Sequence, residues 1–177
     1  MIEILYRMFL KLFCHSTPQK YAKYIGVHLD GEVSIVAQPN WGSEPYLITI
    51  GNHTRISFGV TFLTHDGATW VFRDTPEYKD KHIMKYGKIV VGNNCFIGCK
   101  SIIMPNVTIG NNSIIGAGSL VTKSVPDNEV WAGVPARRIC SLEDYIQKCA
   151  DTNNQYDMKL FAENKRKALE KFFYEED

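Results

Sequence analysis

One histidine stands where the regular pattern of this sequence is interrupted. His65, in the segment FLTHDG, is followed by a long stretch that is rich in aromatic residues. An imidazole changes its charge close to neutral pH, so it can take the proton of a hydroxyl group in a transition state. The next residue, Asp66, can either orient the imidazole or cap a turn. The position therefore favours a general base at residue 65.

Cysteine usage and histidine spacing give little support for disulfide or metal chemistry. The five cysteines are odd in number and contain no CxxC pair, which argues against a disulfide framework and a zinc ribbon. We therefore expect a reducing compartment and a cytoplasmic protein. His53, His65 and His82 do not have the spacing that would assemble three metal ligands, so no metal site is predicted.

Charge and hydropathy exclude two further classes of function. The 177 residues carry 20 Lys and Arg against 19 Asp and Glu, and this balance gives no support for nucleic-acid binding. No apolar run reaches the roughly 18 residues that would indicate a membrane-spanning helix. The N-terminal segment MIEILYRMFLKLF predicts an amphipathic helix that packs on the body, or alternatively one that lies weakly on a membrane surface.

The elements that position His65 follow from an internal repeat of six residues. The repeat places aliphatic side chains at Val91, Ile97, Ile103, Ile109, Ile115 and Val121, and glycine follows four of them. A period of six requires a short extended segment and a tight corner, where Gly and Asn tolerate positive φ. Three such segments complete one turn of a coil, and coils stack at about 4.8 Å with the aliphatic residues inward. Cys95 falls at an inward position of this repeat, and Cys99 faces outward.

The repeat is interrupted twice before residue 91. The same six-residue spacing appears at Ile50, Ile56 and Phe62, but the separation from Phe62 to Val91 is not a multiple of six. We therefore expect a loop excursion over 66–88, a length that usually indicates a functional loop. The segment QPNWGSEPY, residues 38–46, is a smaller interruption.

The predicted fold is mainly β, a parallel solenoid with helices at both ends. We expect an N-terminal helical segment over 1–24, the coiled domain over 25–140 and a C-terminal helical tail over 141–177. The tail begins with a sequence that resembles a capping box at Ser141. Residues 157–174 predict a second amphipathic helix.

Residues 89–140 strongly resemble the last coils of the hexapeptide-repeat acyltransferases, above all in the strings IGAGSLVTKSVP and AGVPAR. Within that superfamily the chain is most similar to the sugar and polysaccharide O-acetyltransferases, and next to the xenobiotic acetyltransferases. The resemblance implies a left-handed parallel β-helix, a homotrimer and a site in the groove between neighbouring subunits. It also implies acetyl-CoA as cosubstrate, a saccharide acceptor in surface-polysaccharide biosynthesis, and His65 as the general base.

The resemblance also assigns residues to the cosubstrate and the acceptor. The family's cofactor-binding positions fall on Phe96, Cys99, Ala117, Thr122, Lys123 and Arg137. Phe96 stands where Trp is common in the family, and Cys99 where Ser or another small polar residue is frequent. Asp66, Trp70 and Arg73 are the predicted acceptor-binding residues, because aromatic faces stack on sugar rings; these loop residues could equally anchor the loop on a neighbouring subunit.

Three alternatives compete with the transfer of acetyl to a sugar. An antibiotic or another xenobiotic could be the acceptor in the same chemistry. A zinc-binding protein like the γ-type carbonic anhydrases would need three histidine ligands at coil-matched spacing, which this sequence lacks. A noncatalytic scaffold would have no need of His65 or of cationic residues in the last coils.

Overall fold

The computed structural model describes residues 5, 17–81, 83–153 and 157–174. Most of the predicted N-terminal helix, with its alternative role at a membrane surface, and also Cys14 and His82 lie outside these residues. No helix in the described ranges is long and apolar enough to cross a bilayer. The chain forms two compact units, residues 1–142 and 143–177, which we describe separately.

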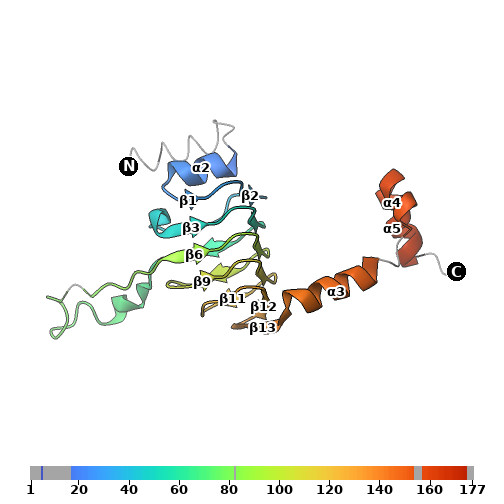
Figure 1. Cartoon of the computed structure of the whole chain (residues 1–177). Coiled ribbons are helices and arrows are strands. Elements are labelled where there is room, and N and C mark those ends of the chain that lie inside the picture. Colours follow the sequence, from blue (N-terminus) through green and yellow to red (C-terminus); the bar gives the residue numbers. More distant parts are fainter. Residues whose placement is uncertain (1–4, 6–16, 82, 154–156, 175–177) are drawn as a thin grey trace. The chain divides into compact units, whose positions relative to one another are not determined.

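Thirteen short strands in the described part of the first unit form three sheets (Figure 1). The first sheet contains β1 (His28–Leu29), β3 (Ile48–Ile50), β6 (Ile89–Val91) and β9 (Thr108–Ile109). The second contains β2 (Ser34–Ile35), β4 (Arg55–Ile56), β7 (Phe96–Ile97), β10 (Ile114–Ile115), β12 (Glu129–Gly133) and β13 (Ala136–Ser141). The third contains β5 (Thr61–Phe62), β8 (Ile102–Ile103) and β11 (Leu120–Val121). The prediction of a mainly β chain with parallel strands is confirmed.

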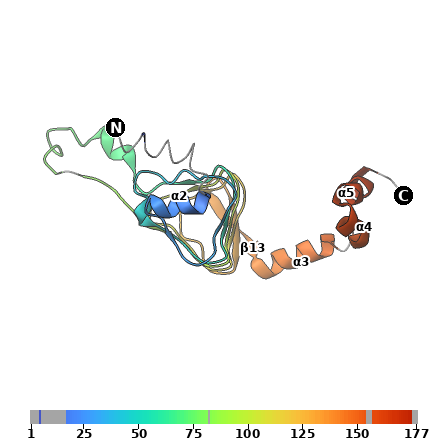
Figure 2. The same cartoon turned by 90° about the horizontal axis from the view of Figure 1, so that it is seen from above.

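From β3 to β11 the chain visits the three sheets in rotation, one strand at a time. Val90 pairs with Thr108 and Phe96 with Ile114, so each residue of these strands lies beside the one three hexads further along the chain. All named pairs are parallel except β12 with β13, which is antiparallel and ends the series. Seen from above, the successive coils lie over one another (Figure 2).

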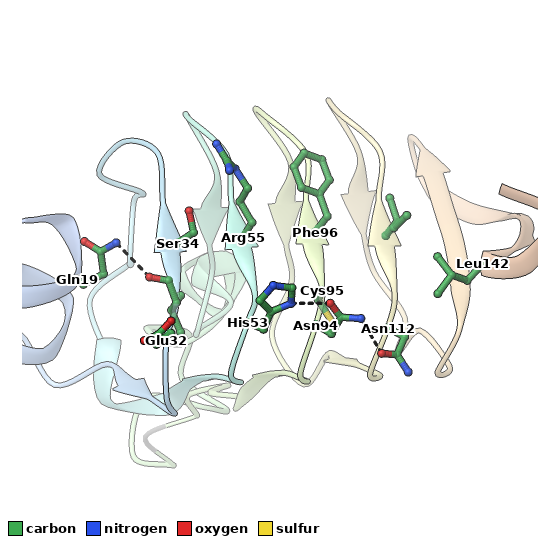
Figure 3. Close-up of a pocket in the computed structure, with 12 residues that line it drawn as sticks. Gln19, Glu32, Ser34, His53, Arg55, Asn94, Cys95, Phe96, Asn112 and Leu142 are labelled. Carbon is green, nitrogen blue, oxygen red and sulfur yellow. Dashed lines mark hydrogen bonds between the residues drawn. The ribbon is translucent and has the colours of Figure 1, made fainter. Parts of the chain in front are cut away.

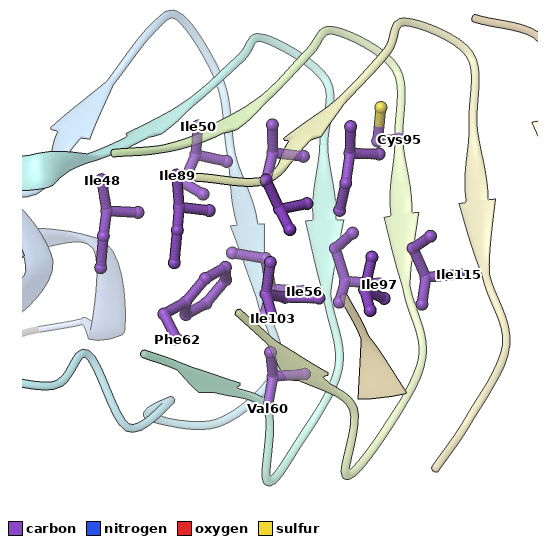
Figure 4. Packing of buried hydrophobic residues seen from close by; sticks show 14 of the residues in the cluster. Ile48, Ile50, Ile56, Val60, Phe62, Ile89, Cys95, Ile97, Ile103 and Ile115 are labelled. Carbon is purple, nitrogen blue, oxygen red and sulfur yellow. The ribbon is translucent and has the colours of Figure 1, made fainter. Parts of the chain in front are cut away.

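The core is a set of stacked aliphatic columns inside the coils (Figure 4). The six residues of the predicted series from Val91 to Val121 are all at most 1% exposed, which confirms that they point inward. Cys95 is 3% exposed, so its assignment to the core is also confirmed. The buried hydroxyls of Ser101 and Ser113 donate to the carbonyls of Gly116 and Pro126, at 3.0 and 2.8 Å.

Asparagine side chains form hydrogen bonds between successive coils at the corner between the first and second sheets. The side-chain oxygens of Asn93 and Asn111 accept the backbone N–H of Asn52 and Asn93, each at 2.8 Å, one coil before. Asn94 and Asn112 have φ values of 54° and 55°, the left-handed conformation that asparagine tolerates better than most residues. The register of the coils is therefore held at this corner by side chains as well as by the ladders.

One helix packs on the first coil, and the second unit is helical. The helix α2 (Pro18–Tyr24) begins after Thr17, whose side chain accepts the N–H of Lys20, and it buries Ala22 on the first coil. The second unit carries α3 (Leu142–Asn153), α4 (Met158–Glu163) and α5 (Lys165–Tyr174). The prediction of one helix over 157–174 is wrong, because Asn164 has φ −150° and ψ 88° and separates α4 from α5. The prediction that a helix begins after Ser141 is confirmed, since α3 begins at Leu142; Ser141 is also the last residue of β13.

Candidate functional site

His65 lies at the mouth of a long loop between β5 and β6. The two ends of this loop are joined by an antiparallel bridge between His65 and Tyr86, and the N–H of Gly87 donates to the Thr64 carbonyl at 2.8 Å. The two rings also meet edge to face, with centroids 6.0 Å apart. The backbone of His65 is therefore fixed on both sides, while 39% of its side chain remains accessible to solvent.

Glu44 holds the imidazole of His65. Its Oε2 atom lies 3.0 Å from Nδ1 of His65, and it also accepts the hydroxyl of Thr64 at 2.6 Å. Thr64 is 1% exposed and the Glu44 side chain 15% exposed, so solvent has little access to this carboxylate. Charge-assisted hydrogen bonds of this kind are about twice as strong as neutral ones.

The carboxylate is ionised in spite of its partial burial. Burial alone would raise the pKa of Glu44, but the hydrogen bonds from Thr64 and His65 and the charge of His65 together outweigh it, and the pKa is lowered. An ionised carboxylate can only accept, so Nδ1 of His65 must carry the hydrogen. When the ring is neutral, the other nitrogen, Nε2, therefore presents its lone pair and can act as a base.

Asp66 caps a turn and does not hold the imidazole. Its Oδ1 accepts the N–H of Ala68 at 2.9 Å, at the start of the 3₁₀ turn η2 (Gly67–Val71), and its Oδ2 pairs with Lys85 at 3.4 Å. The backbone hydrogen bond to Ala68 and the Lys85 ammonium lower the pKa of this carboxyl. Of the two roles open to Asp66, the structure shows the turn; its contact with an acceptor stays a prediction.

The loop over residues 66–88 carries aromatic rings that are paired with cations. The guanidinium of Arg73 lies 4.3 Å from the ring centroid of Trp70, which is 68% exposed. The ammonium of Lys81 lies 4.7 Å from the ring of Tyr78. The two predicted acceptor residues of the loop, Trp70 and Arg73, are therefore in contact with each other.

The predicted cofactor residues fall into separate places on the coils. Cys99 and Ala117 share the corner between the second and third sheets, where the N–H of Gly118 donates to the Cys99 carbonyl at 2.8 Å. Thr122 and Lys123 follow β11 and are exposed, at the corner after the third sheet. Arg137 lies on β13 and is exposed, and its guanidinium donates to the carbonyl of Ala136.

Phe96 projects outward from β7 into a cavity of about 630 Å³ over the second sheet (Figure 3). Arg55 and Ile114 stand beside it on the neighbouring strands. Nδ1 of His53 and Oδ1 of Asn94, also in the wall, lie 2.7 Å apart and are hydrogen-bonded. His65 does not line this cavity. Among the described residues, no three His, Cys, Asp or Glu side chains are grouped to hold a metal ion.

Within one chain the structure does not bring His65 together with Cys99 and Ala117. The N–H of Leu63 donates to the Ile103 carbonyl at 2.9 Å, which places His65 at the corner after the third sheet, while Cys99 lies at the corner before it. An extended segment of about six residues separates the two corners, which corresponds to about 20 Å. His65 and the corner of Cys99 and Ala117 thus lie at opposite edges of the third sheet.

The partner of His65 was missed in the sequence because it lies one coil earlier, inside the small interruption at 38–46. A usable signal existed: the glutamate in WGSEPY is an acidic residue in an otherwise apolar and small stretch. Recognising it required the register of two coils, since Ser34 pairs with Arg55 at the same separation along the chain as Glu44 and His65.

Comparison with known proteins gives consistent matches. The family described as bacterial transferase hexapeptide, with six repeats, matches residues 88–123. Protein CapG of Staphylococcus aureus is 47% identical over 169 residues, which cover 94% of this chain and 95% of CapG. A galactoside O-acetyltransferase of Lactococcus lactis is 32% identical, covering 90% of this chain and 76% of that enzyme.

Solved structures agree with the sequence comparison. A galactoside acetyltransferase in complex with coenzyme A superposes with a TM-score of 0.52 at 30% identity, over 80% of each chain. A maltose O-acetyltransferase from Clostridium difficile superposes with a TM-score of 0.58 at 22% identity, over 78% of this chain and 83% of that one. The second likeness concerns the fold alone.

Proposed function

The chain belongs to the bacterial hexapeptide-repeat transferases, and from this membership we propose that it is an acetyl-CoA-dependent O-acetyltransferase of sugars with His65 as general base. The observation that carries the assignment of the base is the contact of Nδ1 of His65 with Glu44 at 3.0 Å. The sugar and the cosubstrate are supported by the galactoside O-acetyltransferase of Lactococcus lactis and by the coenzyme A complex. The acceptor belongs, in this proposal, to surface-polysaccharide biosynthesis.

His65 and Glu44 have separate roles in the proposed reaction. Acetyl-CoA supplies a thioester carbonyl that the acceptor oxygen attacks. Nε2 of His65 takes the hydroxyl proton as the oxygen attacks, and it holds this proton until it passes to the leaving sulfur. Glu44 keeps the ring in the tautomer that this transfer needs and stabilises the imidazolium while it exists. General-base help of this kind is worth roughly 10²- to 10⁴-fold in rate.

The residues assigned to coenzyme A fit its chemistry. Ala117 is exposed, and a Cβ built on Gly118 would meet nothing within 4 Å, so the backbone of this corner is open to a ligand with amide groups. Lys123 and Arg137 are exposed cations in the last coils, as phosphate groups require. Phe96 and Thr122 complete the set together with Cys99.

We further propose that the coils wind left-handedly and that the active unit is a homotrimer, as in the family. A trimer lets the edge of the third sheet that carries His65 in one subunit face the edge that carries Ala117 in its neighbour. This arrangement would join the two parts of the site that the single chain keeps about 20 Å apart. Analytical ultracentrifugation would measure the oligomeric state directly, and a monomer with full activity would contradict the shared site.

Replacement of His65 tests the proposal. We expect His65→Ala to lower kcat for acetylation of a galactoside by at least about 10²-fold, because the general base is removed. The rate is measured from the release of the coenzyme A thiol. Calorimetry should give an acetyl-CoA affinity within about twofold of the wild type, since no binding contact to the cosubstrate is assigned to His65. His28→Asn, at an exposed position of β1, is the matched control. Near-normal turnover of His65→Ala would remove this residue from the mechanism.

A further inference from the structure

The carboxylate oxygen that holds His65 also accepts the hydroxyl of Thr64. Oε2 of Glu44 lies 2.6 Å from Oγ1 of Thr64 and 3.0 Å from Nδ1 of His65. Thr64 is 1% exposed, whereas 39% of the His65 side chain is accessible to solvent. The three side chains therefore form a short hydrogen-bonded chain with the Thr64 hydroxyl at its buried end and the imidazole at its open end.

The backbone around Thr64 is fixed independently of its hydroxyl. The N–H of Leu63 donates to the Ile103 carbonyl on the third sheet at 2.9 Å, and the Thr64 carbonyl accepts the N–H of Gly87 at 2.8 Å. The side chain of a threonine is also stiff, because its β-carbon is branched. The hydroxyl thus has a defined position from which it can orient a more flexible partner.

Glu44 is such a partner, because it lies in an irregular segment. It directly precedes the 3₁₀ turn η1 (Pro45–Leu47), and its carbonyl accepts the N–H of Leu47 at 3.0 Å. Its side chain makes no capping hydrogen bond to this turn. A glutamate has three rotatable side-chain bonds and visits many rotamers unless contacts restrict it. The turn therefore places the backbone of Glu44, and the orientation of the carboxylate depends on what the oxygens contact.

The hydroxyl of Thr64 also supports the charge of this carboxylate. Burial raises the pKa of Glu44, and the hydrogen bond from Thr64 is the largest of the interactions that lower it, ahead of the one from His65. Hydrogen bonds from a hydroxyl to a carboxylate are short and strong. Both the position and the ionisation of Glu44, which an imidazolium needs beside it, thus depend on Thr64.

We infer that Thr64 is a positioning residue of the reaction: its hydroxyl fixes Oε2 of Glu44 in the orientation that holds the Nδ1–H of His65. The inference rests on the proposed function and adds a third residue to the pair assigned there. Thr64 acts through Glu44, since its own side chain is too deeply buried to contact a substrate. Its loss should therefore lower kcat and leave the binding of both substrates unchanged.

Removal of the hydroxyl tests this role. We expect Thr64→Val to lower kcat about 10-fold with both KM values within about twofold of the wild type, as for the loss of one hydrogen bond to a charged group. Thr64→Ser keeps the hydroxyl and should retain at least about a third of the wild-type kcat. Thr54→Val is the matched control, with kcat within about twofold of the wild type. Thr54 is also buried, and its hydroxyl donates to the Gly92 carbonyl at 2.8 Å at the corner between the first and second sheets.

A double-mutant cycle shows whether Thr64 acts through Glu44. In a Glu44→Ala background there is no carboxylate to position, so Thr64→Val should change kcat by less than about twofold. If Thr64→Val does not fold, Thr64→Ala removes the same hydroxyl with less bulk and takes its place in the cycle. Wild-type kcat for Thr64→Val, an equal loss in Thr64→Ser, or the same loss with and without Glu44 would overturn the inference.

The tautomer of His65 separates this inference from the proposed reaction. Nitrogen-15 NMR spectra of the histidine rings, recorded where His65 is neutral, distinguish a protonated Nδ1 from a protonated Nε2, and the His65 signals are identified by their absence in His65→Ala. The wild type and Thr54→Val should show the Nδ1–H form, and Thr64→Val a mixture of both forms. If no sugar is acetylated but these spectra are obtained, the proposed function fails and the positioning of Glu44 by Thr64 stands. An unchanged Nδ1–H form in Thr64→Val would contradict it.

Discussion

The contact between Glu44 and His65 makes a sharp prediction for Glu44→Gln. The substitution keeps the size of the side chain and an oxygen that can accept from Thr64 or His65, but it removes the negative charge. In the proposed reaction the imidazole becomes positively charged while it holds the acceptor proton. The carboxylate is therefore more important in the transition state than in the resting enzyme, and the loss should appear in kcat.

The magnitude follows from the distance and the exposure of the pair. Two unit charges at the observed 3.0 Å attract by about 1.4 kcal/mol in a water-like medium and about 5.5 kcal/mol at an effective dielectric constant of about 20. The His65 side chain is 39% exposed and that of Glu44 15% exposed, which lies between the two limits. We therefore expect about 2–4 kcal/mol, or roughly 30- to 1,000-fold in kcat.

The assay measures kcat and both KM values for Glu44→Gln, with Glu163→Gln on the exposed surface of α4 as the matched carboxylate-to-amide control. Stability gives a second readout. Since the pKa of Glu44 is lowered in the folded protein, ionised Glu44 stabilises the fold above its unfolded pKa of about 4.3, and this contribution disappears as the pH falls through the lower folded pKa. The difference in free energy of unfolding between wild type and Glu44→Gln should shrink below about pH 4. A variant with wild-type kcat would refute the role assigned to this carboxylate.

Two further pairs of substitutions test the cosubstrate site and the coils. Lys123→Ala and Arg137→Ala should each raise the KM for acetyl-CoA by about 10-fold, the loss of one charge-assisted contact, without a change in the KM for the sugar; Lys167→Ala on α5 is the control, and equal effects of all three would contradict the assignment. Ile103→Ala should lower the free energy of unfolding by about 2–5 kcal/mol in urea titrations because the side chain is fully buried, whereas the outward-facing Ile102→Ala should cost less than about 1 kcal/mol. Similar losses at 102 and 103 would show that the third sheet is covered on both faces.

The repeat made the coils predictable because one physical requirement recurs in every hexad. Each turn must bury an aliphatic side chain above its equivalent, so Ile97 and Ile115 stand in register on paired strands. The same spacing predicted Cys95 inside the core. The tail offered no such repetition: Asn164 ends α4 and precedes α5, and helical periodicity continues across that break.

The partner of His65 was not predictable from spacing, because contacts between irregular segments do not follow a period. Asp66 is adjacent in sequence and carboxylic, which made it a natural candidate to orient the imidazole. Its oxygens are instead held by Ala68 and Lys85. Glu44 meets His65 only because its own coil is longer than the standard turn of three hexads.

Both interruptions of the repeat occur at the same corner of the coil. In the first sheet His28 pairs with Thr49, Thr49 with Val90 and Val90 with Thr108, and only the last of these steps is the regular three hexads. The additional residues of the two longer steps leave the coil at the corner after the third sheet, where Glu44 contacts Thr64 and His65. Regular coils can offer only a repeating surface, since each turn presents what the turn before it presented. Placing two insertions at one corner is what brings the carboxylate of Glu44 into contact with the imidazole of His65.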